Sequence, residues 1–325
     1  MNPVRASGRV YSPGFQGRRQ LMSKYHGIFT PICTPFSPSD QSIQEDALRR
    51  LVDFQLASGV HGIIPCGGTG EFATLSFEER KRVTEITVDQ VNKRVPVMVH
   101  TGACSTWEVI ELSRHAESAG CDALMIVPPF YEVPSDDELI AHYSAISDAV
   151  PLPIMVYNIP AHSKINLRPE LLHRLAQIPN VQMLKDSTGD LVQFQQILEE
   201  LSESLIIFNG SDTGSFAGLS HGAKGCVWGV ANAAPRQCVE LYELVVEKRD
   251  LIKAREIWKP LYRLNHFFET EGYAATAKAA TTMAGVDMGV PRAPFTPLTE
   301  EQRSRLEVLM QDVGALAEQA APVAG

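Results

Sequence analysis

Lys185 stands at the end of an apolar stretch and is the strongest candidate in this sequence for covalent chemistry. The stretch VQMLKDSTGD covers residues 181–190 and begins with the pattern of a buried strand. A lysine is rarely buried without a partner, and burial favours the neutral amine, which is nucleophilic. The pattern therefore indicates an amine that could attack a carbonyl carbon. A lysine that extends to the rim of the fold would have the same local pattern and is the alternative.

A tyrosine occupies the matching position on the preceding predicted strand. Tyr157 ends the apolar segment 154–157, as Lys185 ends the segment 181–185. A phenol at that place could pass protons to and from a carbinolamine formed on Lys185. An isolated tyrosine is usually a core residue, so it is the pairing with Lys185 that favours a catalytic role.

The turn GGTGE at residues 67–71 is a candidate anion site. Closely spaced backbone amides just before a helix can bind a carboxylate. Phosphate is the weaker hypothesis, because no Lys-Ser or Lys-Thr pair follows as a P-loop requires. A 2-oxo acid would suit both features, with its carboxylate at this turn and its ketone carbon at Lys185. A tight turn that binds nothing is the alternative.

Eight short apolar segments alternate with amphipathic helical patterns. The predicted strands are residues 27–31, 62–65, 95–100, 123–127, 154–157, 181–185, 205–208 and 225–230. Strands that are each followed by a helix indicate a parallel sheet covered on both faces. Their number predicts an α/β fold of the (β/α)8 TIM-barrel type. An open nucleotide-binding sheet is less well supported, because FTPICTPF after the first strand lacks a glycine-rich turn.

Such a barrel places its active site at the C-terminal ends of the strands. Those ends are polar and glycine-rich, and Lys185 is the only lysine among them. They read PCGGTGEF, PPFYEVP, YNIPAHS, LKDSTGD, NGSD and GVANAAP. Asp186 is expected to point away from Lys185, because side chains alternate along a strand. The histidines show no metal-ligand spacing, and His162, on the loop after the fifth strand, faces either a substrate or solvent.

The predicted barrel covers residues 23–248, between two segments of different character. Residues 1–22 are basic and contain no acidic side chain. We expect either a disordered extension or a start codon assigned too early, with Met22 as the alternative start, and not a secretory signal, since the apolar core of such a signal is missing. Residues 249–325 carry helical patterns at 250–269, 273–284 and 300–317, which predict a C-terminal helical region packed on the barrel.

Charge and composition favour a small metabolite as the ligand. The 325-residue chain has a net charge of -9 and a pI near 5.5, which argues against nucleic-acid binding through clustered basic residues. No apolar run is long enough to span a bilayer, so no membrane is expected as a partner. The six cysteines are scattered without metal-ligand spacing, which predicts reduced thiols in a cytoplasmic protein.

Several motifs together resemble one known family. They are GGTGE at 67–71, PPFY at 128–131, YNIPA at 157–161, LKDSTGD at 184–190 and GVANAAP at 229–235. Through them the chain is similar, over almost its whole length, to the N-acetylneuraminate lyase and dihydrodipicolinate synthase family. These proteins are class I aldolases and hydro-lyases that form a Schiff base.

The resemblance implies a site for pyruvate or another 2-oxo acid that needs no metal or organic cofactor. Lys185 matches the Schiff-base lysine of the family, and Tyr157 matches its proton-relaying tyrosine. Thr69, with the backbone amides of Gly68 and Thr69, matches the site that binds the pyruvate carboxylate, and Gly70 of the same turn is counted among the substrate-binding residues.

Further positions are implied by the same resemblance. Tyr131 matches a tyrosine that reaches a neighbouring subunit's site in synthases, and Val230 matches a residue of strand eight that flanks pyruvate. Asp212 matches a lyase residue that contacts the polyhydroxyl tail of the substrate, while Thr213 replaces the acid of sialate lyases. A homotetramer built as a dimer of dimers is expected, as is common in the family.

Two departures from the family leave the reaction open. Gly68 replaces a threonine or serine whose hydroxyl bridges two tyrosines, and His162 replaces an arginine that holds aspartate semialdehyde in synthases. GGTGEF is similar to the 5-dehydro-4-deoxyglucarate dehydratases, whereas YNIPA is similar to the lyase branch. The hypothesis is therefore aldol cleavage, condensation or dehydration of pyruvate or a 2-oxo-3-deoxy sugar acid. The alternatives are 4-hydroxy-tetrahydrodipicolinate synthase, which condenses pyruvate with aspartate semialdehyde, and a catalytically silent barrel that binds a 2-oxo acid.

Overall fold

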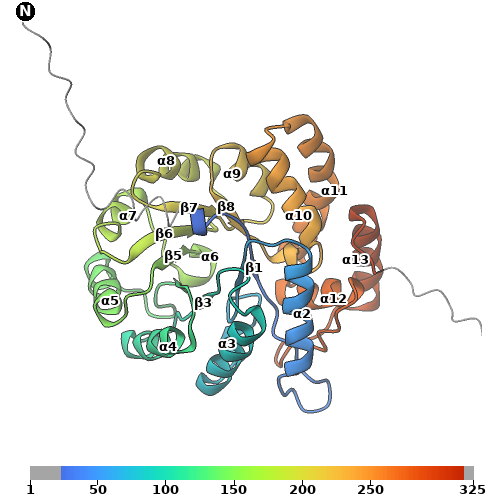
Figure 1. The fold of residues 1–325 in the computed structure, drawn as a ribbon, viewed down its shortest axis with the longest axis horizontal. Helices are drawn as coiled ribbons and strands as arrows, with labels where there is room; N and C mark the ends of the chain where they lie inside the picture. Colours follow the sequence, from blue (N-terminus) through green and yellow to red (C-terminus); the bar gives the residue numbers. More distant parts are fainter. Residues whose placement is uncertain (1–22, 318–325) are drawn as a thin grey trace, which may run out of the picture.

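The computed structural model describes residues 23–317 and confirms the predicted barrel. Eight parallel strands lie inside a ring of helices (Figure 1), in the neighbour order β2-β1-β8-β7-β6-β5-β4-β3. A parallel bridge between Ile63 and Val97 joins the two ends of this order, so the sheet is nearly closed. The strands are β1 (Gly27–Pro31), β2 (Gly62–Ile64), β3 (Met98–His100), β4 (Ala123–Ile126), β5 (Ile154–Asn158), β6 (Val181–Asp186), β7 (Ile206–Asn209) and β8 (Gly225–Val227). The extension predicted at residues 1–22 lies outside the described residues.

One helix or more follows each strand, and together these helices form the ring. They are α2 (Glu45–Ala57), α3 (Phe77–Val91), α4 (Thr106–Ala119), α5 (Asp136–Ala149), α7 (Pro169–Leu175), α8 (Leu191–Leu201), α9 (Ser215–Ser220) and α10 (Pro235–Tyr242). Shorter helical turns are η1 (Phe72–Thr74), α6 (Pro160–Ser163), η2 (Gly229–Asn232) and η3 (Glu243–Glu247). A capping box begins α3, because the Glu79 amide donates to the Ser76 hydroxyl at 3.2 Å and the Ser76 amide donates to the Glu79 carboxylate at 2.8 Å.

The eighth strand is shorter than predicted, which changes the setting of Val230. β8 ends at Val227, and Val230 lies in the η2 turn instead of in a strand. The Asn232 side chain donates to the carbonyls of Gly229 and Pro31, both at 2.9 Å. These side-chain bonds take the place of strand pairing and fold the chain into the turn.

The third strand is also shorter than predicted. β3 begins at Met98 instead of at residue 95, because the Val97 amide donates to the Asp122 carboxylate at 2.8 Å. The same carboxylate accepts a bond of 2.6 Å from Lys24, which lies before β1. The other strand bounds differ from the prediction by at most one residue at either end.

Alternation along the strands separates an inner apolar core from an outer one. The inner core fills the barrel and consists of Tyr25, Phe29, Ile64, Met98, Ala123, Met125, Val127, Met155, Tyr157, Met183, Ile206, Phe208 and Val227. The outer core lies between the strands and the helices and includes Leu184 of β6. Lys185 follows Leu184 and shares the face of Met183, so its side chain starts toward the barrel interior. Asp186 then shares the outer face.

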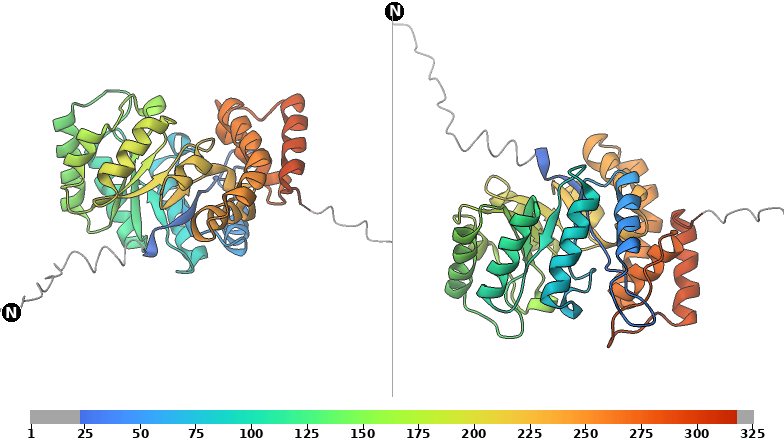
Figure 2. Two further views of the ribbon diagram at one scale, coloured as in Figure 1. Left: turned by 90° about the horizontal axis from the view of Figure 1, so that it is seen from above. Right: turned by 60° about the horizontal axis from the view of Figure 1, so that its bottom comes forward.

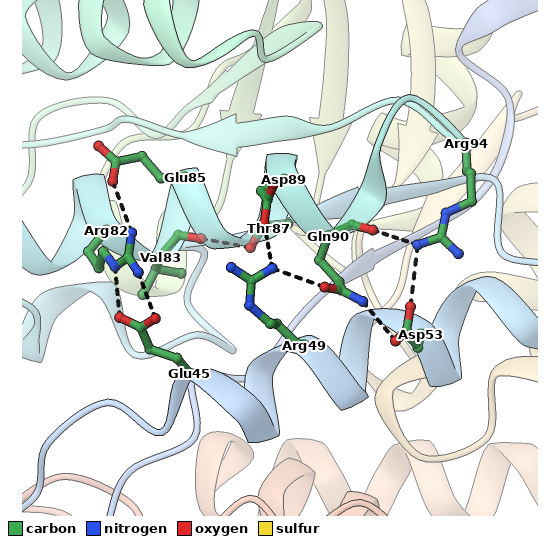
Figure 3. Close-up of polar contacts among 10 residues, drawn as sticks. All are labelled: Glu45, Arg49, Asp53, Arg82, Val83, Glu85, Thr87, Asp89, Gln90 and Arg94. Carbon is green, nitrogen blue, oxygen red and sulfur yellow. Dashed lines mark hydrogen bonds and ion pairs between the residues drawn. The ribbon is translucent and has the colours of Figure 1, made fainter.

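Helices α2 and α3 lie side by side and carry ion pairs along their exposed edges (Figure 3). Arg82 of α3 donates to both carboxylate oxygens of Glu45 of α2, at 2.7 and 2.6 Å. Arg49 of α2 reaches Asp89 of α3 at 2.6 Å. Exposed ion pairs contribute little to stability, so the buried apolar faces of the two helices hold them together.

Three helices follow the barrel and lie together on one side of it, in orange and red (Figures 1 and 2). They are α11 (Leu251–Thr270), α12 (Tyr273–Met283) and α13 (Glu300–Val313). α11 contacts α10, η2 and η3, and α12 contacts η2. The last helix ends earlier than predicted, because Gly314 takes a left-handed conformation with φ of 70°. Within residues 23–317, no helix is long and apolar enough to cross a bilayer.

Candidate active site

Lys185 and Tyr157 lie next to each other at the C-terminal ends of β6 and β5. The strand register pairs the two residues directly. The side-chain nitrogen of Lys185 lies 3.9 Å from the centroid of the Tyr157 ring. Lys185 is 6% exposed, and within residues 23–317 its nitrogen has no hydrogen-bond or ion-pair partner. The amine is therefore available to an electrophile, and it lies over the face of the tyrosine ring.

Gly210, directly after β7, leaves space for the Lys185 side chain. A Cβ atom at this position would lie 2.6 Å from Lys185 Cε and 2.3 Å from the Ser187 hydroxyl oxygen. The Gly210 amide donates to the Asp186 carbonyl at 2.7 Å, and Ser187 donates to the Gly210 carbonyl at 2.7 Å. The backbone at Gly210 is thus fixed against the lysine, and a larger residue would displace the amine. The NGSD sequence shows this glycine at a strand end but does not reveal its contact.

Asp186 points away from the amine, as the alternation of strand side chains predicts. Its carboxylate accepts from the Asn158 side chain at 2.8 Å and from the Thr188 hydroxyl at 2.6 Å. Burial raises the pKa of Asp186, and these two hydrogen bonds act against that rise. The residue organises the outer side of the strand end and does not belong to the reactive cluster.

The turn after β2 has the form of an anion site. Thr69 is buried, and within residues 23–317 the amides of Gly68 and Thr69 donate no hydrogen bond. Gly70 is required by close packing, since a Cβ there would lie 2.9 Å from the Ile32 carbonyl oxygen. A Cβ on Gly68 would meet nothing within 4 Å, so the missing side chain leaves open space. Carboxylate binding by these amides stays a prediction.

A buried ion pair holds this turn to the C-terminal helices. Lys278 of α12 lies 2.5 Å from the Glu71 carboxylate, and the two side chains are 1% and 2% exposed. The Arg292 amide donates to the other carboxylate oxygen of Glu71 at 3.0 Å. Burial lowers the pKa of Lys278, and the charge of Glu71 opposes that change. The sequence reasoning missed this pair, because nothing local relates residues so far apart in the chain.

Asp212 and Tyr273 form a second buried contact between the barrel and the C-terminal helices. The Tyr273 hydroxyl donates to Asp212 Oδ2 at 2.6 Å, and the Val230 amide donates to the same oxygen at 3.4 Å. Asp212 is 3% exposed, and burial raises its pKa to about 7. The structure thus brings together Asp212 and Val230, two predicted site residues, and adds Tyr273. No sequence signal marks Tyr273, which starts a helix assigned to packing.

Tyr131 and His162 lie outside this cluster. Tyr131 follows β4, is 89% exposed and has a positive φ of 83°. His162 is exposed on the short helix α6, after the end of β5. Within this single chain neither side chain joins Lys185, Tyr157 and Asp212. Their predicted roles therefore need either a substrate or a second subunit.

The reactive groups at the strand ends are an amine, phenols and a carboxylate. Among residues 23–317, no group of three or more His, Cys, Asp or Glu side chains could hold a metal ion. All six cysteines lie in this range as free thiols, and only Cys104 is exposed.

A model of the dihydrodipicolinate synthetase family matches residues 24–313 of the chain. Two curated relatives are each 38% identical and are named 4-hydroxy-tetrahydrodipicolinate synthase. The protein of Phenylobacterium zucineum aligns over 90% of this chain and 98% of its own length. The protein of Syntrophobacter fumaroxidans aligns over 90% of this chain and 100% of its own length.

Solved structures give the same result. The dihydrodipicolinate synthase of Acinetobacter baumannii in complex with pyruvate superposes with a TM-score of 0.85 at 32% identity, covering 90% of this chain and 99% of that one. The dihydrodipicolinate synthase of Thermotoga maritima superposes with a TM-score of 0.86 at 30% identity, covering 90% of this chain and 100% of that one.

Proposed function

Because the chain belongs to the dihydrodipicolinate synthetase family, we propose that it is a lyase whose Lys185 forms a Schiff base with pyruvate or a closely related 2-oxo acid. The observation that carries this proposal is the position of the Lys185 nitrogen. It lies 3.9 Å from the centre of the Tyr157 ring and has no partner within residues 23–317. An amine in this setting is a nucleophile with a phenol beside it for proton transfer.

The chemistry begins with attack of the neutral Lys185 amine on the ketone carbon. The carbinolamine that forms loses water, with protons passed by the Tyr157 hydroxyl, and leaves an iminium. The iminium accepts the electron pair released when a proton leaves the adjacent carbon, which gives an enamine. The enamine carbon then attacks an aldehyde, or the reverse sequence cleaves a carbon–carbon bond. The Lys185 iminium is the electron sink throughout, so we propose that no metal or organic cofactor takes part.

The rest of the site binds the acid. The free amides of Gly68 and Thr69 are suited to the 2-oxo acid's carboxylate, and Gly70 lets the turn pack closely on Ile32. Val230 lies beside Asp212 in the η2 turn, where its side chain is fully buried. These residues orient the ketone for attack by Lys185.

The names of the curated relatives support aspartate semialdehyde as the second substrate. Proteins that are 34% to 38% identical over nearly the whole chain are named 4-hydroxy-tetrahydrodipicolinate synthase. The first candidate is therefore condensation of pyruvate with aspartate semialdehyde.

Specific features of the site support a second candidate, a 2-oxo-3-deoxy sugar acid. Gly68 leaves open space where a hydroxyl is expected for a synthase, and exposed His162 stands in place of an arginine. Asp212 is buried close to Val230 and could face the hydroxyl groups of a longer substrate. If this second candidate is correct, the enzyme cleaves or dehydrates the sugar acid through the same Lys185 iminium.

The test is borohydride reduction in the presence of pyruvate. We expect a covalent adduct that maps to Lys185 by peptide mass spectrometry and is absent from Lys185→Ala. Lys253→Ala, which removes an exposed lysine of α11, is the matched control and should retain the adduct. Turnover of pyruvate with aspartate semialdehyde supports the first candidate, and release of pyruvate or dehydration of 2-oxo-3-deoxy acids supports the second. An unmodified Lys185 would contradict the proposal.

We further propose a homotetramer in which Tyr131 completes a neighbouring subunit's site. The support is the 89% exposure of this aromatic side chain in the single chain. Light scattering gives the assembly state, and mixing Lys185→Ala with Tyr131→Phe chains tests whether sites are shared. Mixed assemblies should recover activity that neither variant has alone.

A further inference from the structure

Tyr273 brings a hydroxyl group from the C-terminal helices to the strand ends of the barrel. It is the first residue of α12, and its hydroxyl donates to Asp212 at 2.6 Å. The ring lies against Gly229, where a Cβ atom would come within 2.0 Å of the hydroxyl oxygen. The glycine therefore makes room for the phenol, and the contact with Asp212 is built into the fold.

Several bonds fix Asp212 in place. In addition to the Tyr273 hydroxyl, the Val230 amide donates to its carboxylate at 3.4 Å. The Asn265 side chain donates to its backbone carbonyl at 3.1 Å, and Asn265 in turn accepts from the indole N–H of Trp228 at 3.0 Å. The carboxylate has little freedom to move, so it need not reorient to stabilise a positive charge that develops nearby.

The short loop of residues 210–212 connects this carboxylate to the reactive lysine. Gly210 at one end packs against Lys185, where a Cβ would lie 2.6 Å from the lysine Cε. Asp212 at the other end interacts electrostatically with Lys185, and Tyr273 interacts in the same way with Tyr157. The Asp212–Tyr273 pair is therefore linked to Lys185 through residues 210–212 and by charge, and to Tyr157 by charge alone.

We propose that Tyr273 is a positioning residue that orients the Asp212 carboxylate, through the 2.6 Å hydrogen bond, as the counter-charge for the Lys185 iminium. This inference rests on the proposed Schiff-base function. A fixed negative charge close to the developing cation stabilises it more than it stabilises the neutral ketone and amine. Tyr273 itself does not touch the reacting atoms and acts through Asp212.

The pair makes the reaction depend on pH. The titratable groups that interact electrostatically with Asp212 are Tyr273 of α12, Glu269 of α11, Lys185 of β6, Cys226 of β8 and Cys238 of α10. Burial raises the pKa of Asp212 to about 7, and Glu269 adds to the rise. The Tyr273 hydrogen bond and the charge of Lys185 lower it. Loss of the hydroxyl therefore raises this pKa further and leaves fewer ionised carboxylates at neutral pH.

The experiment measures the rate of imine formation with pyruvate between pH 5 and pH 9, by borohydride trapping. In Tyr273→Phe we expect the acid limb of the profile to move up by about one pH unit, with a rate about fivefold lower at pH 7. At pH 9 the rate should return toward that of the unmodified chain. A purely structural role would lower the rate equally at every pH and would overturn the inference.

Two further variants keep the inference falsifiable if Tyr273→Phe folds poorly. Glu269→Gln removes a charge that raises the pKa of Asp212, so its acid limb should move to lower pH. Asp212→Asn should slow imine formation and abolish the limb, and adding Tyr273→Phe to it should change nothing more. An unmoved limb in Glu269→Gln, or a further loss in the double variant, would overturn the role of the pair. Absence of any adduct in the unmodified chain would overturn the proposed function itself.

Discussion

The side-chain nitrogen of Lys185 lies over the ring of Tyr157 because the two residues are paired across β5 and β6. Both start on the inner face of the barrel, where Met155 and Met183 precede them in the inner core. The register of two neighbouring strands therefore sets the distance between the amine and the phenol. No loop has to close to bring them together.

The Tyr157 hydroxyl can be removed without removing the ring. We expect Tyr157→Phe to keep the lysine in place and to lower kcat by about 10²–10⁴-fold, since only the proton transfer is lost. Steady-state kinetics with pyruvate and the second substrate measure this. Tyr143→Phe, which loses a buried bond of 3.0 Å to the Ile126 carbonyl, is the control and should keep kcat. Equal kinetics in the two variants would contradict a relay through Tyr157.

A methyl group at residue 210 should displace the reactive amine. Gly210→Ala places its Cβ within 2.6 Å of Lys185 Cε, so the lysine side chain must shift. We expect about 100-fold slower imine formation and a loss of about 1–3 kcal/mol in unfolding free energy. Trapping kinetics and urea unfolding measure the two effects. If Gly210→Ala formed the adduct at the normal rate, the predicted displacement of the Lys185 amine would be wrong.

Loss of the buried ion pair between Glu71 and Lys278 should destabilise the protein more than loss of an exposed ion pair. Lys278→Met leaves the Glu71 carboxylate buried without its partner, which should cost about 3–5 kcal/mol of unfolding free energy. The double variant with Glu71→Gln should recover much of this loss. Chemical denaturation measures both.

A surface ion pair provides the comparison for Lys278→Met. Arg82→Met removes the bidentate contact with Glu45 between α2 and α3 (Figure 3) and should change the midpoint of unfolding very little. A large loss of unfolding free energy in Arg82→Met, or no loss in Lys278→Met, would contradict the prediction that the buried pair matters more for stability.

Asp212 should make the protein less stable as the pH rises. Its pKa is raised by burial from 3.8 to about 7, so the folded state holds a proton that the unfolded state releases between these values. The unfolding free energy contributed by this group therefore falls between about pH 4 and pH 7. Asp212→Asn should lose this slope and gain relative stability at pH 8. Urea unfolding at pH 5 and pH 8 tests this, and equal effects of the substitution at both values would contradict it.

Local patterns predicted most of the fold and the centre of the site. Short apolar segments predicted the strands to within a residue at most ends, and the alternation of strand side chains predicted that Asp186 points away from Lys185. The errors came from side chains that act at long range. Asn232 ends β8 before Val230, and no pattern around residue 230 indicates it.

The contacts that complete the site could not be predicted from local patterns. Tyr273 and Lys278 lie on a helix whose sequence indicates only packing, yet they reach Asp212 and Glu71. Such contacts depend on how the C-terminal helices dock on the barrel, which a single sequence does not specify. The sequence left His162 facing either a substrate or solvent; its side chain is exposed in the single chain, and a substrate contact stays a prediction.

The two contacts that α12 makes with the barrel limit how far this enzyme can be shortened from its C-terminal end. Helix α12 holds the turn after β2 through the Lys278–Glu71 ion pair and the loop after β7 through the Tyr273–Asp212 hydrogen bond, so it links two of the loops at the strand ends. A truncated chain that stops after α10 would keep every strand but would lose both the Lys278–Glu71 ion pair and the Tyr273–Asp212 hydrogen bond. Minimal versions of this catalyst should therefore retain α12, or supply its two contacts from elsewhere.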